Sequence, residues 1–215
     1  MNIITNFEKI KQEIKNNLPQ RDVKVIAVSK TFSLEHVMPL VNYGHKHFGE
    51  NKVQEAEKKW SDTLSKNKNI ELHMVGPIQS NKIKSAIKIF SVIHSVEKIK
   101  TLKIINENLS SDSRLKQLFL QVNISKESSK SGIYLEEMDN FFNEAKKYSK
   151  IGVSGLMTLP PPDEEPSLYF ALLNKLSTKN MLKHLSMGMS SDFETAIALG
   201  STHIRVGEAI MGPRE

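Results

Sequence analysis

The chain has 215 residues, no cysteine and a formal net charge of +6. Its length suits one domain with its own apolar core, and the lack of cysteine excludes disulfides and thiolate chemistry and favours a reducing compartment. No apolar run approaches the roughly 20 residues of a membrane span, and the polar start MNIITNFEKIKQEIKNNL lacks the apolar stretch of a signal peptide. We therefore expect a soluble, cytoplasmic protein with no membrane partner.

The positive charge is spread along the whole chain, in groups such as KKW, KNK and KIK that fall inside helical patterns. Solvated helix faces explain such lysines. The aromatic residues are few and do not interleave with the basic ones, as they would in a base-stacking platform. We expect no nucleic-acid partner.

Short β-branched or apolar runs alternate with amphipathic stretches of helical period after a first helix near the N-terminus. Ser33 is expected to cap one helix, Glu35 and Glu50 to lie near helix starts, and Gly200 to end the last long helix. The expected strands are residues 23–30, 45–51, 71–77, 92–96, 118–124, 152–158, 184–188 and 202–207, and the expected helices after Ser33 include VQEAEKKWSDTLSK, SNKIKSAIKIF, VEKIKTLKIINENL, LEEMDNFFNEAKKYS, PSLYFALLNKLS and SDFETAIALG.

About eight strand-then-helix units with an extra N-terminal helix predict a (β/α)8 TIM barrel, formed by residues 1–215 as a single domain. A doubly wound open sheet is the alternative, because alternation does not separate the two. The first strand is not followed by GxGxxG, which weighs against a dinucleotide-binding fold. The proline-rich TLPPPDEEP, residues 158–166, is expected to be a loop after a strand.

Lys30 follows the apolar run VIAV, so a barrel would hold its amine at the carboxyl ends of the strands, where barrel enzymes keep their working groups. Partial desolvation lowers a lysine pKa and makes the amine nucleophilic, able to form a Schiff base with an aldehyde. The strand position alone leaves open a lysine that extends to solvent from a strand end.

Two glycine turns lie close together near the C-terminus, in SMGMSSDFETAI and HIRVGEAIMG. Ser190 and Ser191 are expected at or near a helix cap, where backbone N–H groups and the helix dipole favour an anion. Gly207 would form a second backbone nest beside the first, where barrel enzymes often bind phosphate. The alternative is that Ser190 simply caps its helix and the glycines are packing turns.

The histidines give a weaker signal. His45 and His47, two residues apart, would face one side of a strand, but a metal site needs further ligands and the spacing offers no third. We expect no metal site, and we expect His73 and His203 to be strand residues with satisfied nitrogens. A nucleophile-elbow pattern GxSxG is missing from the sequence.

Six segments in order, AVSKT, HFGENKVQEAEKKW, LHMVGPIQSNK, QVNISKESSKSGI, GLMT and LSMGMSSDFETAIALGSTHIRVGEAIMG, resemble the pyridoxal 5′-phosphate (PLP) homeostasis family. The resemblance runs from about residue 23 to residue 213. These proteins are single-domain relatives of the alanine racemase N-terminal barrel, so the resemblance implies a PLP-binding (β/α)8 barrel of that type.

The resemblance also implies roles for individual residues. Lys30 matches the lysine that forms the Schiff base with the cofactor, and Arg205 matches the arginine that faces the pyridine nitrogen. His73, Asn81 and Lys82 match a signature motif beside the barrel mouth. Asn51 and Met157 match positions near the cofactor ring. The positions at the phosphate are Ser190, Ser191 and Gly207.

Glu208 departs from the family pattern, because a small hydroxyl residue commonly stands at this position. A carboxylate beside a phosphate dianion would repel it. We expect the Glu208 side chain to point away and only its backbone N–H to take part in binding.

The resemblance favours a PLP-binding regulator or carrier in vitamin B6 homeostasis, without catalytic turnover and therefore without catalytic residues. An arginine has only donors, so the ring nitrogen facing it stays unprotonated and stabilises a carbanion modestly. The alternative is a PLP-dependent amino-acid racemase, but racemases of this type add a β-rich domain that supplies a tyrosine base, and this chain ends at Glu215. A third hypothesis is a Schiff-base aldolase. Apo PLP-dependent enzymes are candidate partners, and a monomer is expected.

Overall fold

The computed structural model describes residues 2–17, 22–127, 130–148 and 150–213. The strands are β1 (Lys24–Val28), β2 (His47–Glu50), β3 (Glu71–Met74), β4 (Val92–Val96), β5 (Gln117–Asn123), β6 (Ile133–Tyr134), β7 (Val153–Met157), β8 (His184–Ser186) and β9 (His203–Val206). The helices are α1 (Ile3–Asn17), α2 (Leu34–Asn42), α3 (Val53–Lys66), α4 (Ile83–Ile89), α5 (Ile99–Asn108), α6 (Met138–Ala145), α7 (Ser167–Lys179), α8 (Phe193–Ala198) and α9 (Glu208–Met211), with 3-10 turns η1 (Ser80–Lys82) and η2 (Leu135–Glu137).

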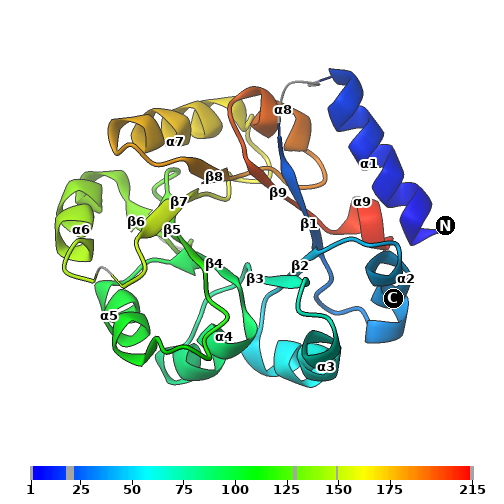
Figure 1. Ribbon diagram of the computed structural model, residues 1–215. Coiled ribbons are helices and arrows are strands. Elements are labelled where there is room, and N and C mark those ends of the chain that lie inside the picture. Colours follow the sequence, from blue (N-terminus) through cyan, green and yellow to red (C-terminus); the bar gives the residue numbers. More distant parts are fainter. Residues whose placement is uncertain (1, 18–21, 128–129, 149, 214–215) are drawn as a thin grey trace.

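The strands close into a parallel barrel. The neighbours run in the order β4-β3-β2-β1-β9-β8-β7-β5, and an additional pairing of β4 with β5 completes the ring. Figure 1 shows this ring with the helices around its outside. Among the described residues, the short β6 pairs with the end of β5 alone and stands outside the ring. The predicted (β/α)8 barrel is therefore confirmed, and the open doubly wound sheet is excluded.

Local sequence patterns explain most of the elements. The buried face of α3 consists of Val53, Ala56, Trp60 and Leu64, whose spacing is that of one side of a helix. Ser33 caps α2 as expected, since its Oγ accepts a hydrogen bond from the backbone N–H of His36 at 3.3 Å.

The N-terminal helix α1 holds the end of the chain against the barrel. Asn6 donates a side-chain hydrogen bond to the carbonyl oxygen of Ile210 in α9, at 3.0 Å. The buried Phe7 packs into the core from α1, and the His36 ring contacts the carbonyl oxygen of Met211 at 2.9 Å. The short helix α9 is thereby held beside β1 (Figure 1).

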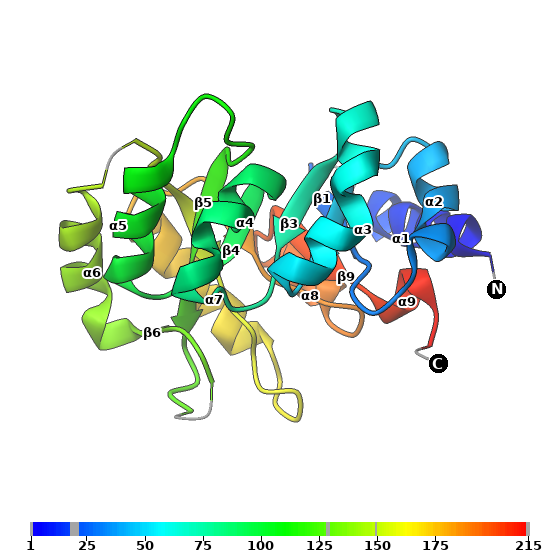
Figure 2. The same ribbon diagram turned by 90° about the horizontal axis from the view of Figure 1, so that it is seen from below.

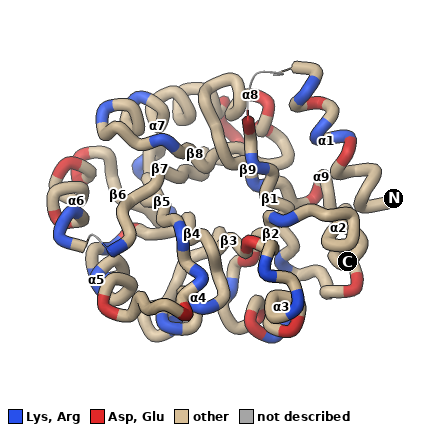
Figure 3. Tube along the Cα trace, in the orientation of Figure 1, with Lys and Arg blue, Asp and Glu red and all other residues tan. Residues whose placement is uncertain are grey.

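The segments that follow β5 and β7 extend on the same side of the barrel (Figure 2). They leave the carboxyl ends of their strands, where barrel proteins place their working loops. Acidic and basic residues are both spread over the outer helices (Figure 3). In the described part of the chain, no helix is long and apolar enough to cross a membrane.

Candidate functional site

Lys30 stands two residues beyond the end of β1, in a tight turn. The backbone N–H of Phe32 donates to the carbonyl oxygen of Ser29 at 3.2 Å, and Thr31 between them has a φ of 72°. A β-branched residue in this left-handed region is strained by roughly 1–3 kcal/mol, and such strain gathers at functional sites. The turn keeps Lys30 half-buried at the carboxyl end of the barrel.

Lys30 and the turn at Gly207 line one small cavity of about 30 Å³, together with Val28, Phe32, Glu208 and Gly212. The cavity lies where β1 and β9 run side by side, with Ala27 paired to Val206. The structure therefore brings the amine and the second glycine turn together, although they are far apart in sequence. Glu208 is exposed and also contributes to this cavity, so the direction of its carboxylate stays a prediction.

The two glycine turns touch each other. The backbone N–H of Ala209 donates to Ser190 Oγ at 3.4 Å, which joins the turn after β8 to the start of α9. Gly188 has a φ of 96°, and a Cβ there would lie 2.6 Å from the Cβ of Ala196, so glycine is required. One hydrogen bond thus holds the two turns next to each other.

Ser190 and Ser191 lie near the start of α8, as expected. The residue before α8 is Asp192, and its Oδ1 accepts from the backbone N–H of Met189 at 2.5 Å. Ser190 instead faces α9, and Ser191 is exposed. A carboxylate therefore closes this turn and leaves the Ser190 hydroxyl directed toward the second turn. Gly200 ends the segment with a φ of 102°, as expected.

Arg205 is buried in β9 and reaches across two neighbouring strands. Its guanidinium donates to Ser186 Oγ at 2.7 Å and to the carbonyl oxygen of Thr158 at 2.9 Å. Burial lowers the pKa of Arg205 to about 10, so it remains a cation at neutral pH. Met157, which precedes Thr158, is fully buried and packs in a small cluster with Val92 and Phe119.

Asn51 follows β2 and lines a separate cavity of about 560 Å³, next to Gln79, Ser80 and Lys82 of the QSNK segment. Its Oδ1 is buried and has no hydrogen-bond partner among the described residues. Since buried polar atoms are nearly always paired, an unpaired acceptor here indicates room for a donor group from outside the chain. Asn81 is exposed and is absent from the residues that line this cavity.

Glu50 is a functional candidate that the sequence patterns miss. It is the last residue of β2, fully buried, and lies three residues before the start of α3. Its Oε1 accepts hydrogen bonds from Ser29 Oγ at 2.7 Å, Lys59 Nζ at 2.8 Å and Trp60 Nε1 at 3.0 Å. Lys59 also donates to the carbonyl oxygen of Ser29 at 2.7 Å. This network fixes the backbone directly before Lys30 and accounts for the acid, lysine and tryptophan of GENKVQEAEKKW.

His73 does not lie beside the barrel mouth, where the motif match places it. His73 is buried and bonds His47 and His94 through its two ring nitrogens, so both are satisfied as expected. These contacts direct it toward the amino end of β2, away from the mouth at Lys30. His203 differs from expectation, because its Nε2 is buried without a partner among the described residues.

The fold and the paired turns define a barrel protein of the alanine racemase N-terminal type. The family model described as "Alanine racemase, N-terminal domain" matches residues 2–215. The pyridoxal phosphate homeostasis protein of Haemophilus influenzae is 34% identical over 100% of this chain and 97% of its own length. That of Escherichia coli K12 is 32% identical over 90% of this chain and 87% of its own. The chain belongs to this family, the pyridoxal phosphate homeostasis proteins.

Solved structures of other proteins have the same fold. PipY of Synechococcus elongatus PCC7942, in a structure with PLP bound, superposes with a TM-score of 0.86 at 30% identity, covering 98% of this chain and 100% of that one. Alanine racemase of Corynebacterium glutamicum has a TM-score of 0.69 at 21% identity, with 97% of this chain and 59% of that chain covered. The racemase likeness shows a shared fold alone.

Proposed function

We propose that the protein binds pyridoxal 5′-phosphate and serves in its homeostasis. The observation that carries this proposal is the shared cavity of Lys30 and Gly207, at the carboxyl ends of adjacent strands. It is supported by the PLP homeostasis proteins of the same family and by the PLP-bound PipY structure. When bound, the cofactor supplies an aldehyde, a phosphate and a ring nitrogen.

The residues of this chain offer a partner for each of those groups. Lys30 provides the amine for a Schiff base with the aldehyde. Ser190, Ser191 and Gly207 belong to the two adjoining turns, whose backbone N–H groups suit a phosphate. Arg205 would face the ring nitrogen, and Asn51 and Met157 would line the pocket around the ring.

Arg205 limits the chemistry of such a site. A guanidinium donates hydrogen bonds and does not release its proton at neutral pH, so the ring nitrogen it faces stays unprotonated. Many PLP enzymes use a carboxylate there, which keeps that nitrogen protonated. An arginine therefore suits retention of the cofactor better than proton abstraction from an amino acid. We propose that the protein holds or delivers PLP without turnover, as a cytoplasmic monomer that supplies apo PLP-dependent enzymes.

The positions of the tyrosines favour the same conclusion over a racemase. Tyr43 follows α2 and is exposed, and Tyr169 in α7 is bonded to Glu164. Tyr134 lies in β6 and Tyr148 beyond α6, both outside the ring of strands. A racemase needs a second base opposite the lysine, and none of the four belongs to the Lys30 cavity.

A spectroscopic comparison of two lysine variants tests the binding proposal. The native protein incubated with PLP should absorb at the violet edge of the visible, and borohydride reduction should fix the cofactor to the Lys30 peptide. Lys30→Ala should lose both signals. Lys52→Ala, a variant of an exposed lysine that lines the neighbouring cavity, should keep both. Retention of the colour in Lys30→Ala would overturn the assignment of the amine.

The proposed absence of turnover has its own test. Pure native protein saturated with PLP should leave the enantiomeric composition of L-alanine and D-alanine unchanged over hours. Racemisation that disappears in Lys30→Ala and persists in Lys52→Ala would establish the enzyme alternative. Transfer is measured by mixing the loaded protein with an apo PLP enzyme, and light scattering reports the oligomeric state.

A further inference from the structure

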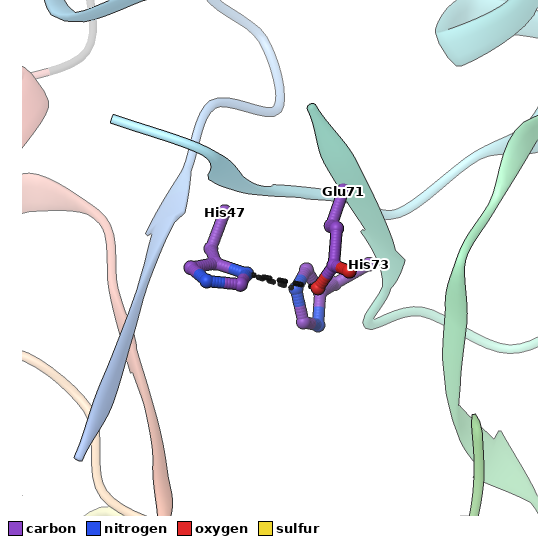
Figure 4. Close-up of side chains that lie close together, drawn as sticks. All are labelled: His47, Glu71 and His73. Carbon is purple, nitrogen blue, oxygen red and sulfur yellow. Dashed lines mark hydrogen bonds and ion pairs between the residues drawn. The ribbon is translucent and has the colours of Figure 1, made fainter. Parts of the chain in front are cut away.

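Three side chains meet at the amino end of the barrel, opposite the end that carries Lys30. His47 is the first residue of β2, Glu71 is the first residue of the neighbouring β3, and His73 follows two positions later in the same strand. The strand register pairs His47 directly with Glu71. Figure 4 shows the two imidazoles and the carboxylate pointing toward one another.

The distances match the edges of a metal coordination polyhedron. His47 Nδ1 lies 3.2 Å from His73 Nε2 and 3.4 Å from Glu71 Oε2. All three ligand atoms lie within 4.8 Å of one another. Ligands bonded to a tetrahedral zinc ion at about 2.0–2.1 Å lie about 3.3–3.5 Å apart. Two of the three distances therefore already suit one ion, and side-chain rotation would have to adjust the third, between His73 and Glu71.

The neighbouring residues orient these ligands. His73 Nδ1 is 3.0 Å from His94 Nε2, and the His94 ring stacks on Phe119 with centroids 4.5 Å apart. A metal-bound imidazole usually donates its other N–H to such a partner, which fixes the ring and its tautomer. The second carboxylate oxygen of Glu71 accepts from Lys116 Nζ at 3.2 Å, which leaves Oε2 directed at His47.

We propose that His47, Glu71 and His73 bind a divalent transition-metal ion of the zinc type, with water at the fourth position. Two imidazoles and one carboxylate are a known zinc ligand set, and nitrogen ligands disfavour Mg²⁺ and Ca²⁺. An ion can enter from solvent, because the His47 and Glu71 side chains are 22% and 24% exposed. His73 is fully buried and forms the inner wall.

The role of this ion is structural. It would link the amino ends of β2 and β3 in the folded protein. The unfolded chain does not hold these three side chains together and would bind the ion less well. An ion that binds the folded state raises its stability by mass action. Lys24 and Lys46 lie near His47 and repel a cation, so the affinity should be below that of a closed zinc finger site.

The test measures zinc binding directly. Tag-free native protein with its cofactor is stripped with chelator, then titrated with zinc chloride by calorimetry and with cobalt chloride by visible absorption. We expect one ion per chain, a tetrahedral cobalt spectrum and a raised melting temperature. His47→Gln and Glu71→Gln should each weaken zinc binding by about 100-fold or more, since even second-sphere changes cost about 10–100-fold.

The matched control is His184→Gln, at the first residue of β8 on the same end of the barrel. This half-exposed histidine is outside the trio, so its variant should bind zinc as the native chain does. The proposal is overturned if the native chain binds no zinc, or if the His47 and Glu71 variants bind it as tightly as the native chain. Equal loss in His184→Gln would assign the ion to a different set of histidines. Because both His47→Gln and Glu71→Gln change partly exposed groups, their melting curves without metal serve as the folding check.

Discussion

Replacing Glu50 by glutamine should destabilise the protein far more than the same change at the surface. Glu50 is 1% exposed, and Lys59, its partner at 2.8 Å, has a side chain that is 12% exposed. Glutamine keeps the size and one acceptor oxygen for Ser29 and Trp60. The substitution therefore removes mainly the negative charge opposite Lys59.

The magnitude follows from burial. Removing one partner of a buried ion pair leaves the other charge uncompensated, which costs about 3–5 kcal/mol. Lys59 keeps its hydrogen bond to the carbonyl oxygen of Ser29 and a little solvent. We therefore expect the lower end, about 3 kcal/mol in the free energy of unfolding. The double variant Glu50→Gln with Lys59→Met should recover most of this loss, because no buried charge is then left unpaired.

Urea unfolding at neutral pH measures the effect, with the cofactor removed so that ligand binding does not contribute. The matched control is Glu55→Gln, which breaks the pair of Glu55 and Lys52 at the start of α3. These side chains are 50% and 66% exposed, so the change should cost below about 1 kcal/mol.

Equal losses for Glu50→Gln and Glu55→Gln would refute the reasoning, since burial would then not decide the cost. Failure of Lys59→Met to restore stability in the double variant would show that the lost hydrogen bonds, and not the lysine charge, are responsible. A further expected result is weaker PLP retention in Glu50→Gln, because the network holds the backbone at Ser29.

Three more predictions test the turns and the barrel interior. Gly188→Ala should destabilise the fold by about 1–3 kcal/mol more than Gly44→Ala, because both have a φ of 96° but only the Cβ at residue 188 would meet a neighbour, Ala196; urea titration of the pair checks this. Burial lowers the pKa of His203 to about 3. The contribution of His203 to the free energy of unfolding is therefore constant above the unfolded pKa of about 6.5 and falls as the pH drops below it, by about 2 kcal/mol at pH 5. In chelator-treated His203→Gln, the free energy of unfolding should depend less steeply on pH in the acid range. Glu208→Gln should change PLP affinity by less than about fivefold, as expected for a carboxylate in solvent, and a larger gain in a PLP titration would mean that it faces the phosphate.

The barrel was predictable because its signals are local. Each strand is a short apolar run and each helix repeats its apolar residues at helical spacing, as in the buried face of α3. The two glycine turns were also visible, since Gly188 and Gly207 each lie within two residues of the end of a strand. The carboxyl ends of parallel strands meet at one end of a barrel, so proximity of these turns to Lys30 followed from topology.

Contacts that depend on the register between strands were not predictable. Glu50 precedes a helix in sequence, and the patterns do not show that its side chain faces inward between β2 and α3, toward Trp60. The other two members of the His47 cluster were hidden for the same reason. Glu71 and His73 come from the next strand, and only the pairing of β2 with β3 brings them within reach.

The charges inside the barrel explain why the two ends of the barrel differ in how they would accept a metal cation. Arg205 is a buried cation near the cofactor end, and its charge, after the larger effect of burial and that of His203, lowers the pKa of His94. The imidazoles that fill the barrel below it are therefore uncharged at neutral pH and present lone pairs. A further cation deep in this layer would be repelled by Arg205. At the open edge, Glu71 supplies the negative charge that the interior lacks, which favours the proposed metal ion between His47 and His73 over a site at the deeper His94 and His203.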